Sequence, residues 1–589
     1  AGAGGRRRRG RGDGRGRDDP AGGRAVSGGP ALAPRPELIT DSVESEGPRW
    51  VALATSTDHK DIGRIYVTAA LSFLVLGLVE FLLIRLQLAI PENDLIEPVT
   101  FNRLLSVMSP TLVVLFVLPL AIGLFTYVVP LQIGARSLAF PRLANFALWL
   151  YLLGGALLYV SFVYTPPEAG FNALPPLSDI AFISNNGVDV WITSVGLSVL
   201  GFTLQAINLI VTIFRLRAPG LVWRRLPPFS FAAFSSSAVL LVVGPAMLAA
   251  LTMLEIDRHF NGVFFDPGEG GAPTYYQHLS WIFFSGCYLL MILPAAGAIS
   301  EILPALARKP LLSRGAVAGS MAAIAGLGLL AWMQNMFTGA IPIGWLYLAM
   351  AAALLLIVPI GLLFANWLAT LAFGSIELRA PMLFALGAIS TLSIGLAGEL
   401  LHAVIPVNWL LADTVDATAM TGYVLVGGSV LGGLAGLYYW FPKMTGRTAG
   451  ESMARWSLAL IILGAHLTFA PMFLAGLEGQ PVDVFKYFEG QGLDTYNLLT
   501  TIGAFVLVLG ITLSLVNLLL SLSHGPRAGP DPWRGDSLEW FATSPPPPHN
   551  FDVVPDVRSD EPMRDIRDAV KRLETRGTTR KAESGEPVA

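Results

Sequence analysis

Twelve long apolar stretches limit what this chain can fold into. Each has roughly 20 residues or more, the length that an α-helix needs to cross the hydrocarbon core of a membrane. Of the 589 residues, 53% are hydrophobic and 14% are charged, whereas soluble domains carry about 25% charged residues. The sequence therefore predicts an all-α membrane protein with twelve spans, near residues 63–87, 106–131, 143–165, 191–214, 231–255, 279–304, 315–335, 341–370, 383–405, 418–441, 456–475 and 497–521.

Positive charges gather in the loops on one side of these spans. Lysine and arginine in short loops favour the cytoplasm, and an even number of spans puts both termini on one side. We therefore expect both termini in the cytoplasm. The loops of the other side carry acids such as Asp179, Asp189 and Asp266, whereas the cytoplasmic loops carry Arg136, Arg142, Arg215, Arg217, Arg224, Arg225, Arg308, Lys309, Arg314, Arg379, Lys443, Arg447 and Arg455.

Polar segments flank the spans and divide the chain into three regions. Residues 1–48 are rich in Gly, Arg, Asp and Pro and hold too few apolar residues to fold alone, so we expect a disordered cytoplasmic tail. The membrane domain covers residues 49–522. Residues 523–589 form a second polar cytoplasmic tail, in which four prolines at 545–548 predict an extended spacer followed by a short charged helix.

Several motifs along the chain match one known family. They are TDHKDIG (57–63), AFPRL (139–143), GLYYWFPKMTG (436–446), DPW (531–533) and LEW (538–540). From about residue 55 to 565 the sequence resembles cytochrome c oxidase subunit I of the haem-copper oxidase superfamily. The resemblance implies a twelve-helix transmembrane bundle of the cytochrome c oxidase subunit I type.

The resemblance also implies where haem and copper would bind. The family uses six histidines on four helices, and each aligned position holds another residue here. The haem-ligand positions hold Ser109, Met420 and Gly422, and the copper-ligand positions hold Ser285, Gln334 and Asn335. Haem iron in this family and copper favour imidazole or thiolate donors. Because these residues offer hydroxyls, amides and one thioether, we expect no haem, no copper and no catalytic residue.

Other positions that the family uses differ as well. Leu289 stands at the copper-site tyrosine, and the outer aspartate of the magnesium-side pair is retained as Asp413. The positions of the haem-propionate arginines hold Val482 and Asp483, and the proton-path positions hold Ser137, Cys287 and Leu363. These differences indicate that proton transfer and haem anchoring were lost together with the ligands.

A few residues leave a second interpretation open. Met420 could ligate a haem iron, but we favour a filler role, since methionine adapts to irregular gaps. Glu399 and His402 share one helix face and could form a proton-active pair, although we favour an interfacial hydrogen bond. We expect Cys287 to be a small buried residue rather than a nucleophile. Because large voids are costly, we expect the haem-sized cavities to be filled by lipid or by side chains such as Met420, Leu289 and Leu363.

These observations favour a non-catalytic subunit I of an aerobic respiratory complex in a bacterial cytoplasmic (inner) membrane. Its expected partners are a ligand-complete subunit I, subunits II and III, and membrane lipid, with no nucleic acid. An active terminal oxidase that passes electrons from cytochrome c to oxygen, the family's activity, is the first alternative. A carrier of protons, ions or small molecules is the second alternative, and a transient assembly factor is the third.

Overall fold

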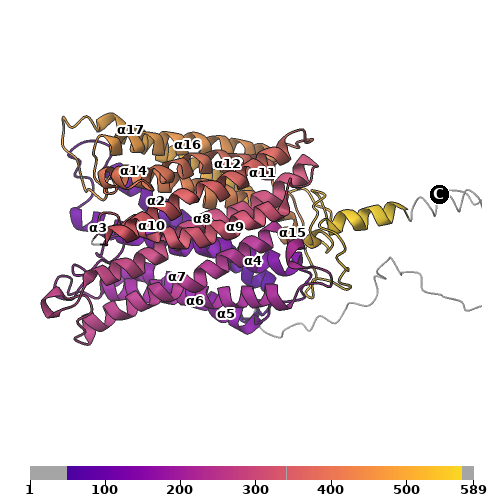
Figure 1. The fold of residues 1–589 in the computed structure, drawn as a ribbon, viewed down its shortest axis with the longest axis horizontal. Helices are drawn as coiled ribbons and strands as arrows, with labels where there is room; N and C mark the ends of the chain where they lie inside the picture. Colours follow the sequence, from indigo (N-terminus) through magenta and orange to yellow (C-terminus); the bar gives the residue numbers. More distant parts are fainter. Residues whose placement is uncertain (1–48, 340, 573–589) are drawn as a thin grey trace, which may run out of the picture. The chain divides into compact units, whose positions relative to one another are not determined.

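The computed structural model describes residues 49–339 and 341–572. Within these residues the regular structure is helical, and the long helices of the bundle run side by side (Figure 1). Twelve helical segments in the described ranges are long and apolar enough to cross a membrane, which confirms the predicted number of spans. The predicted disordered tail, residues 1–48, lies outside the described residues.

The twelve segments extend the predicted spans by a few residues at most ends. In chain order they are α2 (His59–Gln87), α3–η1–α4 (Pro98–Gln132), α5 (Pro141–Tyr164), α6 (Gly187–Arg215), α7 (Pro228–His259), α8 (Pro273–Ala307), α9–η4 (Arg314–Met336), α10–α11 (Ile343–Leu371), α12 (Ala380–His402), α14–η5–α15 (Val415–Thr445), α16 (Glu451–Leu477) and α17 (Asp494–His524).

Four of these segments change helix type or direction along their length. Their parts are α3 (Pro98–Pro110), η1 (Thr111–Val117), α4 (Leu118–Gln132), α9 (Arg314–Leu330), η4 (Ala331–Met336), α10 (Ile343–Leu355), α11 (Ile357–Leu371), α14 (Val415–Val424), η5 (Leu425–Gly432) and α15 (Gly433–Thr445). The shorter elements outside the spans are α1 (Arg49–Ala54), η2 (Trp223–Arg225), η3 (Pro267–Glu269), α13 (Ile405–Leu411), η6 (Leu538–Trp540) and a helix over residues 562–572.

Local sequence signals fix many of the helix starts. The Asp58 side chain accepts a hydrogen bond from the backbone N–H of Lys60, which caps α2, and Ser313 caps α9 through the N–H of Ala316. Helices α5, α7, α8 and α12 have proline in their first turn. The missing N–H of proline costs nothing there, because the first N–H groups of a helix have no partner within the helix.

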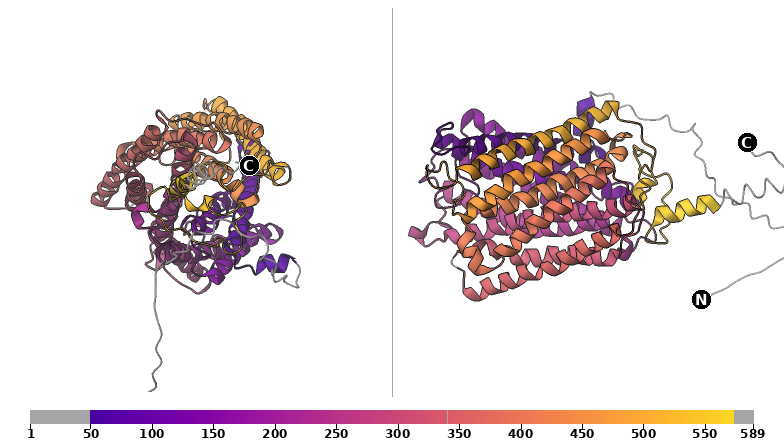
Figure 2. Two further views of the ribbon diagram at one scale, coloured as in Figure 1. Left: turned by 90° about the vertical axis from the view of Figure 1, so that its right-hand side faces the viewer. Right: turned by 90° about the horizontal axis from the view of Figure 1, so that it is seen from above.

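Small residues allow a close contact between two helices of the bundle. Helices α16 and α17 lie side by side (Figure 2). A methyl group added at Gly464 would overlap the backbone of Leu507, and one added at Gly503 would overlap the backbone of Leu467. Glycine therefore lets the two backbones approach, as small residues commonly do between membrane helices.

The C-terminal segment packs onto one end of the bundle. Trp533 and Trp540 are buried, and the indole Nε1 of Trp533 donates to the backbone oxygen of Tyr439 at 2.8 Å. The ammonium group of Lys60 donates to the carbonyl of Pro548 at 3.0 Å. We call the end of the bundle that carries the start of α2 and residues 525–572 the tail face. The helix over 562–572 confirms the expected charged helix. The segment expected to be an extended spacer, 545–548, contacts α2 through the hydrogen bond from Lys60 to Pro548.

Candidate functional site

The aligned ligand positions lie on four of the membrane spans. Ser109 ends α3 just before the π-helical stretch η1, and Met420 and Gly422 lie in α14 just before the π-helical stretch η5. A π-helical stretch is rare and is often found at functional sites. In both spans that carry aligned haem-ligand positions, a π-helical stretch begins within a few residues after the aligned position. The sequence alone did not predict these stretches.

The aligned copper-ligand positions converge in space. The amide Nδ2 of Asn335 in η4 donates to Ser285 Oγ in α8 at 2.9 Å. The amide Nε2 of the adjacent Gln334 donates to the backbone oxygen of Glu399 in α12 at 3.3 Å. Three helices therefore meet around these side chains, through hydrogen bonds between neutral groups.

Apolar side chains pack against the remaining positions. A methyl group added at Gly398 in α12 would overlap the sulfur of Met420, and one added at Gly328 in α9 would overlap Leu289. The ring of Phe469 in α16 occupies the space next to the backbone of Gly422. Met420, Leu289 and Leu363 are all buried, with exposed fractions of 5%, 4% and 1%. These contacts agree with the expected filler role of the three side chains.

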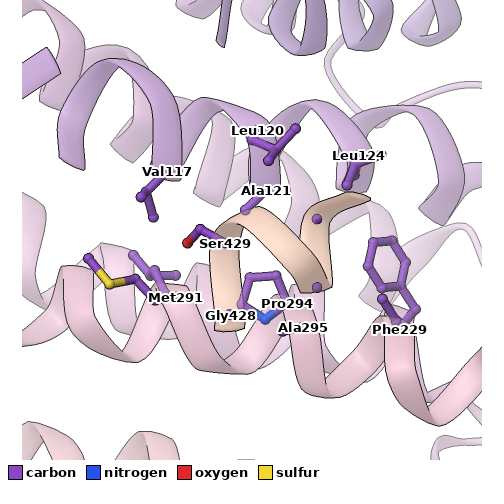
Figure 3. Close-up of a pocket in the computed structure, with 14 residues that line it drawn as sticks. Val117, Leu120, Ala121, Leu124, Phe229, Met291, Pro294, Ala295, Gly428 and Ser429 are labelled. Atoms are coloured by element: carbon purple, nitrogen blue, oxygen red, sulfur yellow. The ribbon is translucent and has the colours of Figure 1, made fainter. Parts of the chain in front are cut away.

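Small cavities remain beside the π-helical stretch η5. One, of about 20 Å³, lies among η1, α4, α8 and η5 and is lined by Leu120, Met291, Pro294 and Ser429 (Figure 3). A second, of about 10 Å³, lies between α2 and η5 and is lined by Leu74, Phe116 and Leu434 among others. Pockets that hold cofactors and drug-sized ligands have volumes of about 300–1,000 Å³. Each of these two cavities is therefore far too small for a haem.

The polar residues toward the opposite face form pairs that differ from the expectation. His402 at the end of α12 lies 3.1 Å from the Asp416 carboxylate at the start of α14, and both are buried. The hydrogen bond of His402 therefore goes to Asp416 rather than to Glu399. The retained carboxylate Asp413 is exposed, and its backbone oxygen accepts a hydrogen bond from the N–H of Val482 at 3.0 Å. Two positions that the family uses at the outer edge of the haems thus lie side by side.

The aligned proton-path positions are separate from one another. Ser137 is exposed on the tail face, where its hydroxyl donates to the carbonyl of Leu138 at 3.1 Å. Cys287 is buried in α8 with an exposed fraction of 1%, as expected. Leu363 is buried in α11. None of these three side chains carries a carboxyl, imidazole or amino group that could relay protons.

Two buried carboxyl groups near the tail face were missed in the sequence. Glu539 in η6 accepts hydrogen bonds from Gln132 at 3.1 Å and from Trp440 at 3.3 Å, while its second oxygen is buried without a partner. Burial raises the pKa of Glu539. Glu301 in α8 accepts a hydrogen bond from Ser537 at 3.3 Å. The LEW motif pointed to position 539, but only the folded tail brings it next to Glu301.

Two of the histidines contact residues other than the aligned ligand positions. His466 Nδ1 is 3.1 Å from the hydroxyl of Tyr423, and His59 is buried on the tail face against Asn550. Within the described residues, the group of three or more His, Cys, Asp and Glu side chains close enough to hold one metal ion is Asp189, Glu255 and His259. That group lies at the ends of α6 and α7, outside the aligned redox positions.

The fold and these positions define a multi-pass membrane protein with the helix framework of a haem-copper oxidase. The profile of the family "Cytochrome C and Quinol oxidase polypeptide I" matches residues 61–506. The chain belongs to this family.

Similar proteins support the same assignment. The chain is 36% identical over 512 residues to cytochrome c oxidase subunit 1 of Bacillus subtilis (strain 168), covering 86% of this chain and 82% of that protein. It is 39% identical over 512 residues to cytochrome c oxidase subunit 1 of Thermostichus vulcanus, covering 86% and 92%. A chain from the cryo-EM structure of a heme-copper terminal oxidase dimer superposes with a TM-score of 0.67 at 16% identity, covering 79% of this chain and 85% of that chain. This last likeness concerns the fold alone.

Proposed function

We propose that this chain is a non-catalytic subunit I of an aerobic respiratory complex. It assembles in a bacterial cytoplasmic membrane beside a ligand-complete subunit I and subunits II and III, with both termini in the cytoplasm. The membrane framework and the family motifs on the tail face support assembly with partner subunits, since these are the parts of the chain whose sequence matches the family.

The observation that carries the proposal is the donor set at the aligned positions. Low-spin haem needs two strong axial ligands, and Ser109 and Gly422 offer a hydroxyl and no side-chain donor. The single ligand of a high-spin haem would be the thioether of Met420, whose sulfur packs against Gly398. Copper would meet the hydroxyl and two amides of Ser285, Gln334 and Asn335, which hydrogen bond within the protein. Amides and hydroxyls are poor ligands for copper compared with imidazole.

The surroundings of these positions support the same conclusion. The two cavities beside η5 have volumes of about 20 and 10 Å³. Val482 and Asp483 stand where the family anchors haem propionates with arginine, so the charge-assisted hydrogen bonds that would retain a porphyrin are missing. The residues present therefore do not fit the family's haems or its copper ion, and we derive no electron-transfer step through them.

An active terminal oxidase is the competing function, and it fits the relatives, which are cytochrome c oxidase subunits 1. The two proposals predict different compositions for the complex that contains this chain. If the chain is non-catalytic, every haem and copper ion of the complex belongs to another subunit. If the chain is an oxidase, it carries haem and copper itself.

Purification of the tagged chain from its native membranes tests the proposal. We expect a histidine-complete subunit I to co-purify, with haem and copper in proportion to that subunit. In a strain that lacks the histidine-complete subunit, we expect the tagged chain to carry neither group. Recovery of the tagged chain from that strain with haem and copper in proportion to itself would contradict the proposal.

A further inference from the structure

Three side chains with metal-binding chemistry meet on the face opposite the tail face. Asp189 lies in the first turn of α6, and Glu255 and His259 lie one helical turn apart at the end of α7. His259 Nε2 is 3.0 Å from Asp189 Oδ1 and 3.9 Å from Glu255 Oε1. One ligand atom from each residue falls within 4.8 Å of the other two.

These separations match the geometry of a small four-coordinate metal site. Zinc binds histidine nitrogen and carboxylate oxygen at about 2.0–2.2 Å in tetrahedral geometry, which places neighbouring ligand atoms about 3.3 Å apart. The two measured distances bracket this value, and the oxygens of Asp189 and Glu255 lie within 4.8 Å of each other. Glu255 and His259 are i, i+4 neighbours on one helix face, and α6 supplies the third ligand.

A second observation concerns a carboxylate oxygen of Glu255 that has no hydrogen-bond partner. Oxygen Oε2 of Glu255 is shielded from solvent and accepts no hydrogen bond. A buried carboxylate oxygen without a partner is rare in folded proteins, because it loses its hydration without compensation. The ion pair with Arg258 satisfies the buried carboxylate of Asp189. It does not provide a hydrogen bond to Oε2 of Glu255.

The residues around the three ligands hold them in place. Arg258 Nε donates to Asp189 Oδ1 at 2.6 Å, and the Arg258 side chain is fully buried. The same guanidinium binds the backbone oxygens of Ser178 and Asn185 in the preceding loop. A ligating carboxylate that is itself hydrogen bonded is typical of metal sites, since the outer contact fixes its orientation.

Charge and exposure also allow an ion to enter. The carboxylates of Asp189 and Glu255 carry two negative charges, and Arg258 neutralises one of them. The Asp257 carboxylate, also in the last turn of α7, accepts hydrogen bonds from the N–H groups of Phe264 and Phe265 instead. The His259 side chain is 37% exposed and that of Glu255 is 36% exposed. Water can therefore reach an open fourth position.

We propose that Asp189, Glu255 and His259 bind one divalent transition-metal ion, with Zn²⁺ as the best-matched ion. The mixed set of one imidazole and two carboxylates favours such an ion over Ca²⁺ or Mg²⁺, which select oxygen ligands, and over Cu⁺, which selects softer ligands. This site joins the outer ends of α6 and α7. It does not depend on the proposed function, since none of its residues is an aligned haem or copper ligand.

Zinc titration of the purified full chain tests the site. The chain is stripped with a chelator in detergent and titrated with Zn²⁺ by calorimetry, and metal is counted after desalting. We expect one zinc per chain, and at least about a tenfold weaker Kd in Glu255→Gln and in His259→Gln, because each removes one ligand. Both variants keep the ion pair between Arg258 and Asp189, so the local fold is retained.

Two matched variants and a second readout make the outcome decisive. His278→Gln removes a histidine at the start of α8 on the same face, and Glu269→Gln removes an exposed acid of the neighbouring loop; both should bind zinc like the wild type. When Co²⁺ replaces Zn²⁺, the wild type should show the visible absorption of four-coordinate cobalt. The Glu255→Gln and His259→Gln variants should not show it. Equal zinc binding by the wild type and the Glu255→Gln/His259→Gln double variant would overturn the proposal.

Discussion

Replacement of Asn550 by alanine should release the C-terminal segment from the bundle. The Asn550 side chain is 1% exposed and joins three parts of the tail face. Its Nδ2 donates to Ala135 O at 2.9 Å and to His59 Nε2 at 2.8 Å, and its Oδ1 accepts from the Lys60 ammonium at 3.1 Å. Asn550→Ala removes all three hydrogen bonds and leaves the partners buried.

The expected size of the effect follows from these contacts. A hydrogen bond between neutral groups contributes about 1 kcal/mol net, and one to a charged group contributes about 2 kcal/mol. The two neutral bonds and one charged bond of Asn550 therefore stabilise the docked segment by about 4 kcal/mol. Lys60 keeps its ion pair with Asp58 at 2.8 Å, so the helices of the bundle should remain folded. A loss of about 4 kcal/mol raises the undocked population about a thousandfold.

Hydrogen exchange measures this change directly. The backbone N–H of Val557 donates to the carbonyl of Pro219 at 3.0 Å, so its exchange reports on docking of the segment. We expect peptides that cover residues 551–560 to exchange about a thousand times faster in Asn550→Ala. His549→Gln is the matched control, because His549 pairs with Asp552 on the surface at 2.6 Å, where an ion pair contributes about 0–1 kcal/mol. An acceleration below tenfold in Asn550→Ala, or an equal one in His549→Gln, would refute the reasoning.

Three further predictions concern pH, packing and topology. Burial raises the pKa of Glu539 above the unfolded value of about 4.3, so its contribution to stability is fully present below that value and is lost as pH rises through the folded pKa. The unfolding temperature of Glu539→Gln should therefore exceed that of the wild type by a margin that grows from about pH 5 to about pH 8.5; a margin that shrinks would contradict this. Gly464→Val should destabilise the chain by about 1–3 kcal/mol or more in thermal unfolding, because the new side chain overlaps Leu507, whereas Gly361→Val in open space on α11 should have little effect. Cysteines introduced at Leu177 and Glu489 should react with an impermeant thiol reagent only from outside the cell; labelling from the cytoplasm would overturn the proposed orientation.

The spans could be predicted from sequence because the membrane imposes a simple rule on length and apolarity. The same rule says nothing of what happens within a span. The change to π-helical turns at Thr111–Val117 and Leu425–Gly432 depends on packing between spans and was therefore missed. Docking of the tail was missed because its contacts join residues far apart in sequence. Lys60 and Asn550 are separated by 490 positions. Both lie in polar segments, and the polar composition of such a segment gives no indication that it is buried.

The candidate site was predicted in part through the resemblance. Alignment to the family placed Ser285 and Asn335 at one site, and the two side chains do form a hydrogen bond. Alignment could not predict the pairing of His402 with Asp416, since it depends on how α12 and α14 end next to each other. The burial of Glu301 beside η6 likewise needs the folded tail. Side-chain pairs that join different elements are set by tertiary packing, and a single sequence carries little information about them.

The measurement that tests the central claim most directly is a spectrum of the isolated chain. The chain is purified free of partner subunits from cells supplied with haem and copper, and a reduced-minus-oxidised spectrum is recorded together with its iron and copper content. Ser109 and Gly422 provide no pair of haem ligands, and Ser285, Gln334 and Asn335 provide no imidazole for copper. We therefore expect no haem band and no bound copper. A stoichiometric haem band, or one copper ion per chain, would contradict the non-catalytic function and identify the chain as an oxidase.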